Sequence, residues 1–216
     1  MEIINLGKEN SIFNQFISEI RDVDIQKDSM RFRRNCERMG EIFAYEISKT
    51  FNYQSKAVTT PLGTAQINLM DERPVLSTIL RAGLPLHQGL LNYFDNADNA
   101  LVSAYRKHKK DGSFIIEAKY MASPSLANRT VILSDPMLAS GASMVEIYKL
   151  LLDKGVPKKL HIVALIASKE GVDFVKRNLP NDTTLWVGAI DDELTAQSYI
   201  VPGLGDAGDL AYGTKE

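Results

Sequence analysis

Hydrophobic residues in the N-terminal quarter of the chain recur at helical spacing. Residues 12–20 are amphipathic, and residues 29–51 carry a longer apolar stripe. The stripe repeats every three or four residues and consists of Phe32, Cys36, Met39, Phe43, Ile47 and Phe51. Because that period places apolar side chains on one face of a helix, it predicts two packing helices. We expect residues 1–57 to form a helical N-terminal extension.

Two short strand-like runs follow the second helix. Residues 58–60 and 65–69 flank the sequence Pro61-Leu62-Gly63, in which proline and glycine favour a turn. Strand-like runs on both sides of such a turn predict a short β-hairpin.

From residue 74 onward, short apolar or β-branched runs alternate with helical segments. The predicted strands are residues 74–80, 100–104, 131–133, 160–166 and 184–190. The predicted helices are residues 84–93, 142–154 and 171–178, with Gly155 ending the second. This alternation is typical of an α/β fold with a central, mostly parallel sheet and helices on both faces. No low-complexity linker interrupts it, so we expect one domain over residues 1–216.

Two segments depart from this alternation. Residues 105–120 place a basic cluster before an Asp111-Gly112 pair and a strand-like run, which predicts a flexible β-hairpin projecting from the sheet. An ordinary solvated hairpin is the alternative. Residues 199–216 contain glycines and aspartates without a helical or strand period. This segment predicts a loop whose backbone comes close to a ligand.

The charge balance limits the classes of ligand. With 25 basic and 27 acidic residues the formal net charge is -2, so we expect no general attraction to nucleic acid or to anionic membranes. No run approaches the roughly 20 apolar residues of a membrane span, and no signal-peptide pattern is present, so we expect a cytoplasmic protein. Cys36 is the only cysteine, which excludes an internal disulfide and a thiolate metal cluster.

Residues 135–143, DPMLASGAS, join a predicted strand to a predicted helix. In α/β proteins such a loop binds anions, since exposed N–H groups and the helix dipole favour negative charge there. Residues 140–143 are small enough for the backbone to surround a phosphate, and two of them carry hydroxyl donors. Asp135 is placed to accept hydrogen bonds from a ribose diol. The alternative is a serine that only caps the helix.

Two arginines follow predicted strands in the same way. Arg81 comes after residues 74–80, and Arg106 comes after residues 100–104. Because parallel strands end at one edge of a sheet, both guanidinium groups are expected near Asp135, where their planar forks suit phosphate oxygens. A Walker loop and a strand-linked dinucleotide motif are absent from the sequence, and the three histidines lack metal-ligand spacing.

Four motifs together resemble those of the uracil phosphoribosyltransferase family, which are type I phosphoribosyltransferases. They are ILRAGL at residues 79–84, YR at 105–106, DPMLASGAS at 135–143 and YIVPGLGDAGD at 199–209, followed by GTK. The similarity covers about residues 59–215. It implies transfer of the phosphoribosyl group from 5-phosphoribosyl 1-pyrophosphate to N1 of uracil, giving uridine monophosphate and pyrophosphate.

The resemblance also implies roles for individual residues. The ribose 5-phosphate and diol would be held by Asp135, Pro136, Met137, Leu138, Ala139, Ser140, Gly141, Ala142 and Ser143, and the pyrophosphate by Arg81 and Arg106. The uracil pocket would be formed by Ile200, Gly205, Asp206 and Ala207. The catalytic residues would be Asp206, Arg106 and Asp135, and Asp206 would also reach the phosphoribosyl substrate.

The same resemblance implies a cofactor and partners. Mg²⁺ would be bound mainly by substrate oxygens and water, without a dedicated set of protein ligands. We expect a homodimer or larger homo-oligomer, and GTP as an effector for which no residues can be assigned. No nucleic-acid or membrane partner is expected.

The phosphate loop departs from the family at one position. The usual turn reads ATGGS, whereas here it reads ASGAS, so Ala142 adds a methyl group. A positive φ at Ala142 would cost about 1 kcal/mol or more. We therefore predict that Ala142 is the first residue of the helix, with a negative φ. LPLHQGL after Arg81 also differs from the more common LGMVDGL, on a predicted helix outside the pocket.

Two other functions fit the same fold class. A regulatory protein that binds pyrimidine nucleotides and RNA would need a broad basic face, whereas the basic clusters are confined to residues 31–34 and 106–110. A phosphoribosyltransferase for a purine would need aromatic stacking and a lysine at the purine edge in place of the GLGDAG tail.

Overall fold

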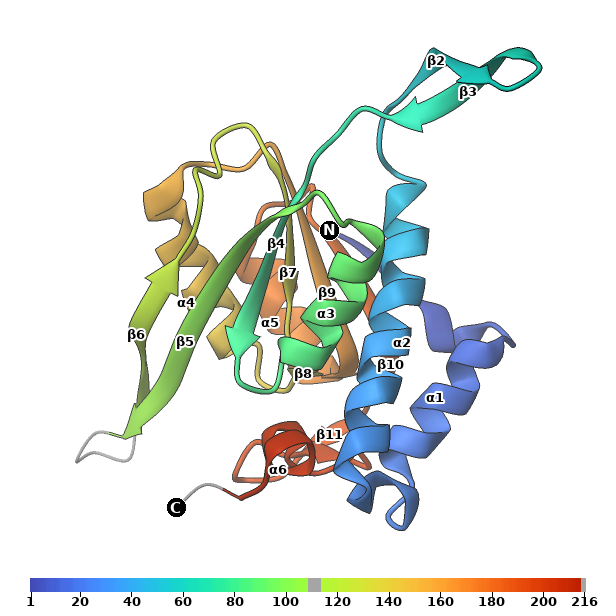
Figure 1. Cartoon of the computed structure of the whole chain (residues 1–216). Coiled ribbons are helices and arrows are strands. Elements are labelled where there is room, and N and C mark those ends of the chain that lie inside the picture. The colour runs from blue at the N-terminus through green and yellow to red at the C-terminus, as the bar shows by residue number, and fades with distance from the viewer. Residues whose placement is uncertain (109–113, 215–216) are drawn as a thin grey trace.

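The centre of the computed structural model is a twisted sheet (Figure 1). The structure describes residues 1–108 and 114–214, and for residues 104–108 and 114–119 only the backbone. Within these residues the sheet has eight strands: β1 (Glu2–Asn5), β4 (Val75–Leu80), β5 (Asp98–His108), β6 (Phe114–Ala122), β7 (Thr130–Ser134), β8 (Met137–Leu138), β9 (Lys159–Ser168) and β10 (Thr184–Asp191). Their order is β1-β10-β9-β7-β4-β5-β6, with β8 paired to β9, and only β6 runs antiparallel to its neighbour.

Helices cover both faces of this sheet. One face carries α1 (Ile12–Arg21), α2 (Ser29–Ser48) and α3 (Leu84–Tyr93), and the other carries α4 (Ala142–Leu151) and α5 (Lys169–Asn178). Alternate strand residues belong to two separate cores, with Leu76 and Val163 in the first and Val75 and Ile162 in the second. Burial on both faces explains why these strands are nearly continuous apolar runs. The predicted α/β fold is confirmed.

Most predicted elements lie close to their expected bounds. The helix at Leu84–Tyr93 matches its prediction, whereas α2 ends three residues before Phe51. The predicted helix at residues 142–154 consists of α4 and a short 3-10 helix, η3 (Leu152–Lys154), and Gly155 ends it with a φ of 114°. None of the helices in the described residues combines the length and apolar character needed to cross a bilayer.

The N-terminal extension was predicted as helical, but it also contributes a strand. β1 pairs in parallel with β10 at the edge of the sheet, and the 3-10 helix η1 (Leu6–Lys8) leads into α1. Four residues are too few to show a period of two, so the sequence pattern did not reveal β1. A further 3-10 helix, η2 (Ile25–Lys27), joins α1 to α2.

Two hairpins extend from this framework. β2 (Tyr53–Thr60) and β3 (Gly63–Met70) pair over eight residues each, which is longer than predicted, and they project away from the sheet beyond the end of α2 (Figure 1). The antiparallel pairing of β5 with β6 confirms the second hairpin. Its predicted Asp111-Gly112 turn lies outside the described residues.

The glycine-rich tail was predicted as a loop throughout, and this is wrong. β11 (Glu193–Leu194) pairs with β12 (Ile200–Val201), and α6 (Ala207–Tyr212) lies near the carboxyl ends of the sheet strands (Figure 1). The Asp206 carboxylate accepts hydrogen bonds from the N–H groups of Gly208 at 2.8 Å and Asp209 at 3.0 Å. This N-terminal cap starts a helix that is too short to show a period in the sequence.

A buried polar pair lies in the core beneath α2. The indole N–H of Trp186 donates to Nδ1 of His161 at 3.1 Å, so this nitrogen must carry no proton. Burial lowers the pKa of His161 from 6.5 to about 4, because desolvation disfavours the imidazolium and Lys159 adds repulsion. His161 is therefore neutral in the folded protein near neutral pH.

We predict that the protein loses stability as the pH falls from about 6.5 towards 4. In this range the unfolded chain binds a proton at His161 that the folded chain does not bind, so the free energy of unfolding should fall by about 2 kcal/mol between about pH 7.5 and pH 5. Urea titrations over that range measure it.

The matched variant is His161→Gln, whose amide oxygen can still accept from Trp186. It should lose most of the pH dependence, leaving a part due to His87, whose pKa is also lowered by burial. The same dependence in the variant and the wild type would contradict the role of His161.

Candidate functional site

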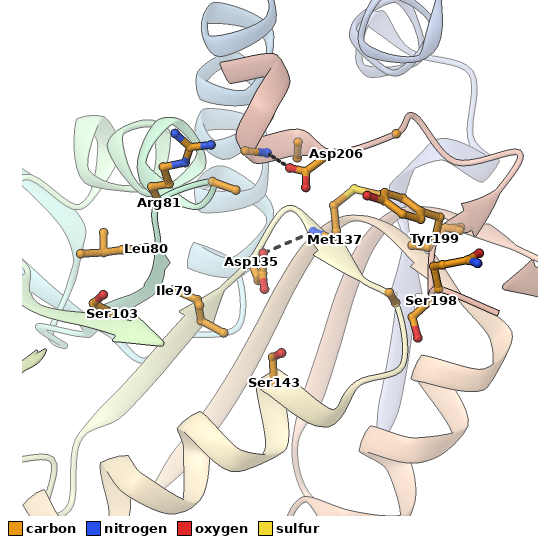
Figure 2. Close-up of a pocket in the computed structure, with 17 residues that line it drawn as sticks. Ile79, Leu80, Arg81, Ser103, Asp135, Met137, Ser143, Ser198, Tyr199 and Asp206 are labelled. Carbon is orange, nitrogen blue, oxygen red and sulfur yellow. Dashed lines mark hydrogen bonds between the residues drawn. The ribbon is translucent and has the colours of Figure 1, made fainter. Parts of the chain in front are cut away.

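A cavity of about 790 Å³ lies at the carboxyl edge of the parallel strands (Figure 2). Its walls come from the end of β4, the middle of β5, the loop after β7, β8, the start of α4, and the tail before and within α6. The lining residues are Ile79, Leu80, Arg81, Ala82, Ser103, Asp135, Met137, Ala139, Ser143, Gln197, Ser198, Tyr199, Ile200, Gly205, Asp206, Ala207 and Gly208. Figure 2 shows Arg81 and Asp206 on one side, Ser143 on the other, and Asp135 between them.

The loop after β7 runs alongside strand β9. The N–H of Asp135 donates to the carbonyl of Val163 at 3.1 Å, and the carbonyl of Pro136 accepts from Leu165 at 3.1 Å and Ile166 at 3.0 Å. Proline has no N–H to pair, so its place in this bend leaves no backbone donor buried. The pairing of β8 with β9 then carries the chain to the turn at residues 139–141.

This turn creates a second hollow next to the main cavity, with a volume of about 20 Å³. It is lined by Asp135, Met137, Leu138, Ala139, Ser140, Gly141, Ser143 and Met144. Gly141 precedes α4 with a φ of 77° and has no side chain to cap the helix. The Ser140 hydroxyl accepts a 3.5 Å bond from the N–H of Ala142, as the alternative of a capping serine expects. The remaining N–H groups of the first turn of α4 suit an anion, and the phosphate site stays a prediction.

The prediction for Ala142 is confirmed. Ala142 is the first residue of α4, and it is not among the described residues with a positive φ. The left-handed conformation falls on Gly141 instead, where glycine has no Cβ to create strain.

A buried serine, Ser168, holds the loop at residues 135–141 in place. The hydroxyl of Ser168 donates to the carbonyl of Ala139 at 2.6 Å and accepts from the N–H of Gly171 at 2.8 Å. A Cβ at Gly171 would come within 2.2 Å of the Ala139 carbonyl, so glycine permits the loop to pack on α5. Sequence reasoning missed this contact. The position of Ser168 before a helix indicates a cap, but nothing in the sequence links it to residue 139.

Arg81 connects the end of β4 with α6. Its Nη2 donates to Oδ1 of Asp209 at 2.9 Å and to the carbonyl of Gly213 at 2.8 Å. Its Nε is buried and has no hydrogen-bond partner among the described residues. The guanidinium is thus oriented by α6 and by the residue that follows it, while the Arg81 side chain remains 35% exposed.

The tail presents backbone to the same cavity. Ile200, Gly205, Asp206 and Ala207, the four predicted pocket residues, all line it. Gly205 has a φ of 94°, and a Cβ built on it would meet no atom within 4 Å. Because Gly205 has no side chain to fill this open space, its polar backbone groups are exposed to a ligand.

Comparison with known proteins identifies the family. The family model described as uracil phosphoribosyltransferase matches residues 8–214. The chain belongs to this family. The match begins before α1, so the uracil phosphoribosyltransferase similarity includes the N-terminal helices, whereas the sequence motifs indicated a start near residue 59.

Individual relatives agree with this assignment. The chain is 56% identical to the uracil phosphoribosyltransferase of Porphyromonas gingivalis over 215 residues, which cover 100% of both chains. It is 38% identical to that of Pyrococcus furiosus over 202 residues, 92% of this chain and 85% of the relative.

Solved structures show the same fold. The AQ2163 protein of Aquifex aeolicus is 27% identical, with a TM-score of 0.85 and 98% of both chains covered. A hypoxanthine phosphoribosyltransferase of Staphylococcus aureus is 14% identical, with a TM-score of 0.50, and covers 86% of this chain and 83% of its own. The latter similarity shows the fold alone.

All but three of the predicted uracil phosphoribosyltransferase site residues line the cavity or the adjoining hollow. Pro136 and Ala142 line neither hollow among the described residues, and both instead shape the backbone. Arg106 was predicted to follow a strand, and this is wrong. It lies within β5, opposite Ile116, because pairing with β6 extends the strand to His108. The Arg106 side chain lies outside the described residues.

Sequence reasoning also missed part of the lining. The unpredicted residues are Ile79, Leu80, Ala82, Ser103, Gln197, Ser198, Tyr199 and Gly208. Five of them lie within the uracil phosphoribosyltransferase motifs at residues 79–84 and 199–209, so the motif bounds could have indicated them. Ser103, Gln197 and Ser198 lie outside the motifs and enter the site only through the path of the chain.

Proposed function

We propose that this chain transfers the phosphoribosyl group of 5-phosphoribosyl 1-pyrophosphate to N1 of uracil, giving uridine monophosphate and pyrophosphate in pyrimidine salvage. The enzyme is then a pentosyltransferase. One observation carries the proposal: the cavity lined by Gly205 and its neighbours adjoins the hollow at the start of α4. The first suits a phosphate and the second suits a small planar base.

The ribose 5-phosphate is assigned to the small hollow at residues 139–143. Backbone N–H groups at the start of α4 and the hydroxyls of Ser140 and Ser143 supply its donors. Asp135 lines both hollows, so its carboxylate can accept hydrogen bonds from the ribose diol between them.

The pyrophosphate is assigned to Arg81 and Arg106. Arg81 lines the cavity and its side chain is 35% exposed, so a ligand can reach its guanidinium. Pyrophosphate oxygens suit this group because charge-assisted bonds to guanidinium are strong.

Uracil is assigned to Ile200, Gly205, Asp206 and Ala207, which lie together on the cavity wall. The edge of uracil presents alternating acceptors and a donor, and backbone N–H and C=O groups can match it. The positive φ at Gly205 orients these groups without a side chain in the way.

The reaction needs alignment and charge stabilisation. The bond between C1 of the ribose and the pyrophosphate oxygen breaks, N1 of uracil bonds to C1 from the opposite face, and the proton on N1 is released to solvent. The two arginines stabilise the negative charge of the leaving group, while Asp135 and Asp206 favour the positive charge that develops on the ribose. The β5–β6 hairpin, which borders the cavity at Ser103, is assigned the exclusion of water.

The cavity wall is also suited to Mg²⁺. The carboxylates of Asp135 and Asp206 line one cavity, and Mg²⁺ prefers oxygen ligands. We assign most of its ligands to substrate oxygens and water. When bound, Mg²⁺ would neutralise charge on the pyrophosphate.

A role as an RNA-binding regulator is less well supported. In the N-terminal basic cluster, Arg31 pairs with Glu19 and Arg34 pairs with Glu37, each at 2.7 Å. These arginines are already neutralised by neighbours, so they offer little attraction to RNA phosphates. The intact tail at residues 199–209 also disfavours a purine as the acceptor base.

An assay with labelled uracil, 5-phosphoribosyl 1-pyrophosphate and Mg²⁺ tests the proposed reaction. We expect labelled uridine monophosphate and one equivalent of pyrophosphate, with no product when hypoxanthine replaces uracil. Failure to form uridine monophosphate would overturn the proposal.

Repeating the assay with GTP tests the expected effector, and fractionation of the source cells tests the expected cytoplasmic location.

Two substitutions at Asp206 separate its proposed role in the reaction from its role as the N-cap of α6. Asp206→Asn retains a good N-cap, so stability should change little, whereas Asp206→Ala should lose about 1 kcal/mol. Both should reduce kcat roughly hundredfold or more, because the charge is lost. Arg106→Ala should also impair turnover, and Lys110→Ala should not. Full turnover in Asp206→Asn would show that the carboxylate has no catalytic role.

A homodimer or larger homo-oligomer is also proposed. The projecting β2–β3 hairpin leaves Leu62, Ile67 and Leu69 100%, 44% and 40% exposed, which favours burial against another copy. Sedimentation velocity should show at least a dimer. Replacing Ile67 and Leu69 by lysine should produce monomer, whereas Tyr93→Lys on α3 should not. A monomeric wild type would contradict the proposal.

A further inference from the structure

The loop that presents backbone to the cavity is held from behind by α1. Arg21, the last residue of α1, forms two bonds of 2.8 Å with the two carboxylate oxygens of Asp191. The N–H of Gly203 donates to Asp191 at 2.9 Å, and its carbonyl accepts from Arg21 at 3.1 Å. Arg21, Asp191 and Gly203 thus form a loop anchor, in which one ion pair satisfies both backbone groups of one residue.

This loop anchor is buried and sterically defined. The Asp191 side chain is 8% exposed and the Arg21 side chain 21%. Gly203 has a φ of 54°, and a Cβ there would lie 2.1 Å from the carbonyl of Ile200, so only glycine fits. Because both charges are paired in a two-pronged geometry, the contact fixes direction as well as distance.

A second contact supports the next residue. In the amide orientation that satisfies both of its side-chain atoms, Gln26 of η2 donates to the carbonyl of Leu204 at 2.9 Å and to that of Ile20 at 3.0 Å. The Leu204 side chain is part of the first core. The N-terminal segment therefore determines where two consecutive loop residues lie.

The loop anchor sits between the residues that line the cavity. Ile200 precedes Gly203 by three positions, and Gly205 follows it by two. Arg21 and Asp191 do not themselves line the cavity among the described residues. Any effect they have on a ligand must pass through the backbone at residues 200–207.

We infer that Arg21 and Asp191 are positioning residues for the base, which fix the backbone that binds uracil although neither side chain touches it. This inference rests on the proposed function. It gives α1 a role in recognition of the pyrimidine, and it predicts that the loop anchor affects uracil much more than 5-phosphoribosyl 1-pyrophosphate. The phosphate loop is separately anchored by Ser168.

The chain offers a matched control in a second ion pair of α1. Arg31 of α2 bonds to the buried Glu19 of α1 at 2.9 and 2.7 Å, so this pair joins α1 to α2 and does not contact the loop. Arg31→Ala and Arg21→Ala each break a two-pronged pair and leave a buried carboxylate. Both should lower the melting temperature, and only Arg21→Ala should alter the site.

Steady-state kinetics separate the two effects. Arg21→Ala should raise the KM for uracil at least about tenfold, within the roughly hundredfold that a 1 Å misplacement can cause, with the KM for 5-phosphoribosyl 1-pyrophosphate within about twofold of wild type. Arg21→Lys keeps a charge beside Asp191 without the two-pronged contact, so it should give an intermediate KM for uracil. Arg31→Ala should leave both KM values unchanged.

Amide hydrogen exchange without substrate gives an independent readout. Exchange at Gly203 and Gly205 should accelerate in Arg21→Ala and not in Arg31→Ala. If Arg21→Ala does not fold, Arg21→Lys carries the same comparisons.

Three kinetic results would each overturn the inference. They are an unchanged KM for uracil in Arg21 variants, equal effects of the Arg21 and Arg31 variants, and equal changes in both KM values. If the wild type forms no uridine monophosphate, the proposed function fails and the assignment to uracil fails with it. Unchanged exchange at Gly203 in an active variant would overturn the positioning role alone.

Discussion

The parallel alignment of β4, β7, β9 and β10 is the constraint on which the site depends. Strands that run in one direction end at one edge, so the loops that follow them meet there whatever their separation in sequence. The arginine after β4, the phosphate loop after β7 and the tail after β10 reach one cavity for this reason (Figure 2). Burial of both sheet faces fixes the strand register, and the register fixes the loop positions.

Each loop is then held by a polar contact from another element. Ser168 bonds to the carbonyl of Ala139, Asp209 orients Arg81, and the loop anchor holds Gly203. Two glycines with positive φ, Gly141 and Gly203, give the backbone the bends that these contacts require. Binding groups supplied by the backbone are thereby set before a ligand arrives, which lowers the entropy lost on binding.

Local signals were sufficient for much of the fold and for the turn before α4. The stripe from Phe32 to Ile47 has a helical period, and the small residues before α4 predict a turn between a strand and a helix, which the structure contains. Arg106 was misplaced because the end of β5 is decided by its pairing with β6, a tertiary effect. The partners of Arg81 and Arg21 lie 128 and 170 residues away in sequence, so no local pattern could link them.

A crystal structure with uridine monophosphate bound would test both halves of the assigned site at once, because one molecule carries the phosphate and the base. We expect 5′-phosphate oxygens within hydrogen-bond distance of the N–H groups of residues 140–143, and uracil against the backbone of Ile200 and residues 205–207. A phosphate bound away from the start of α4, or a base that does not contact the tail, would contradict this assignment.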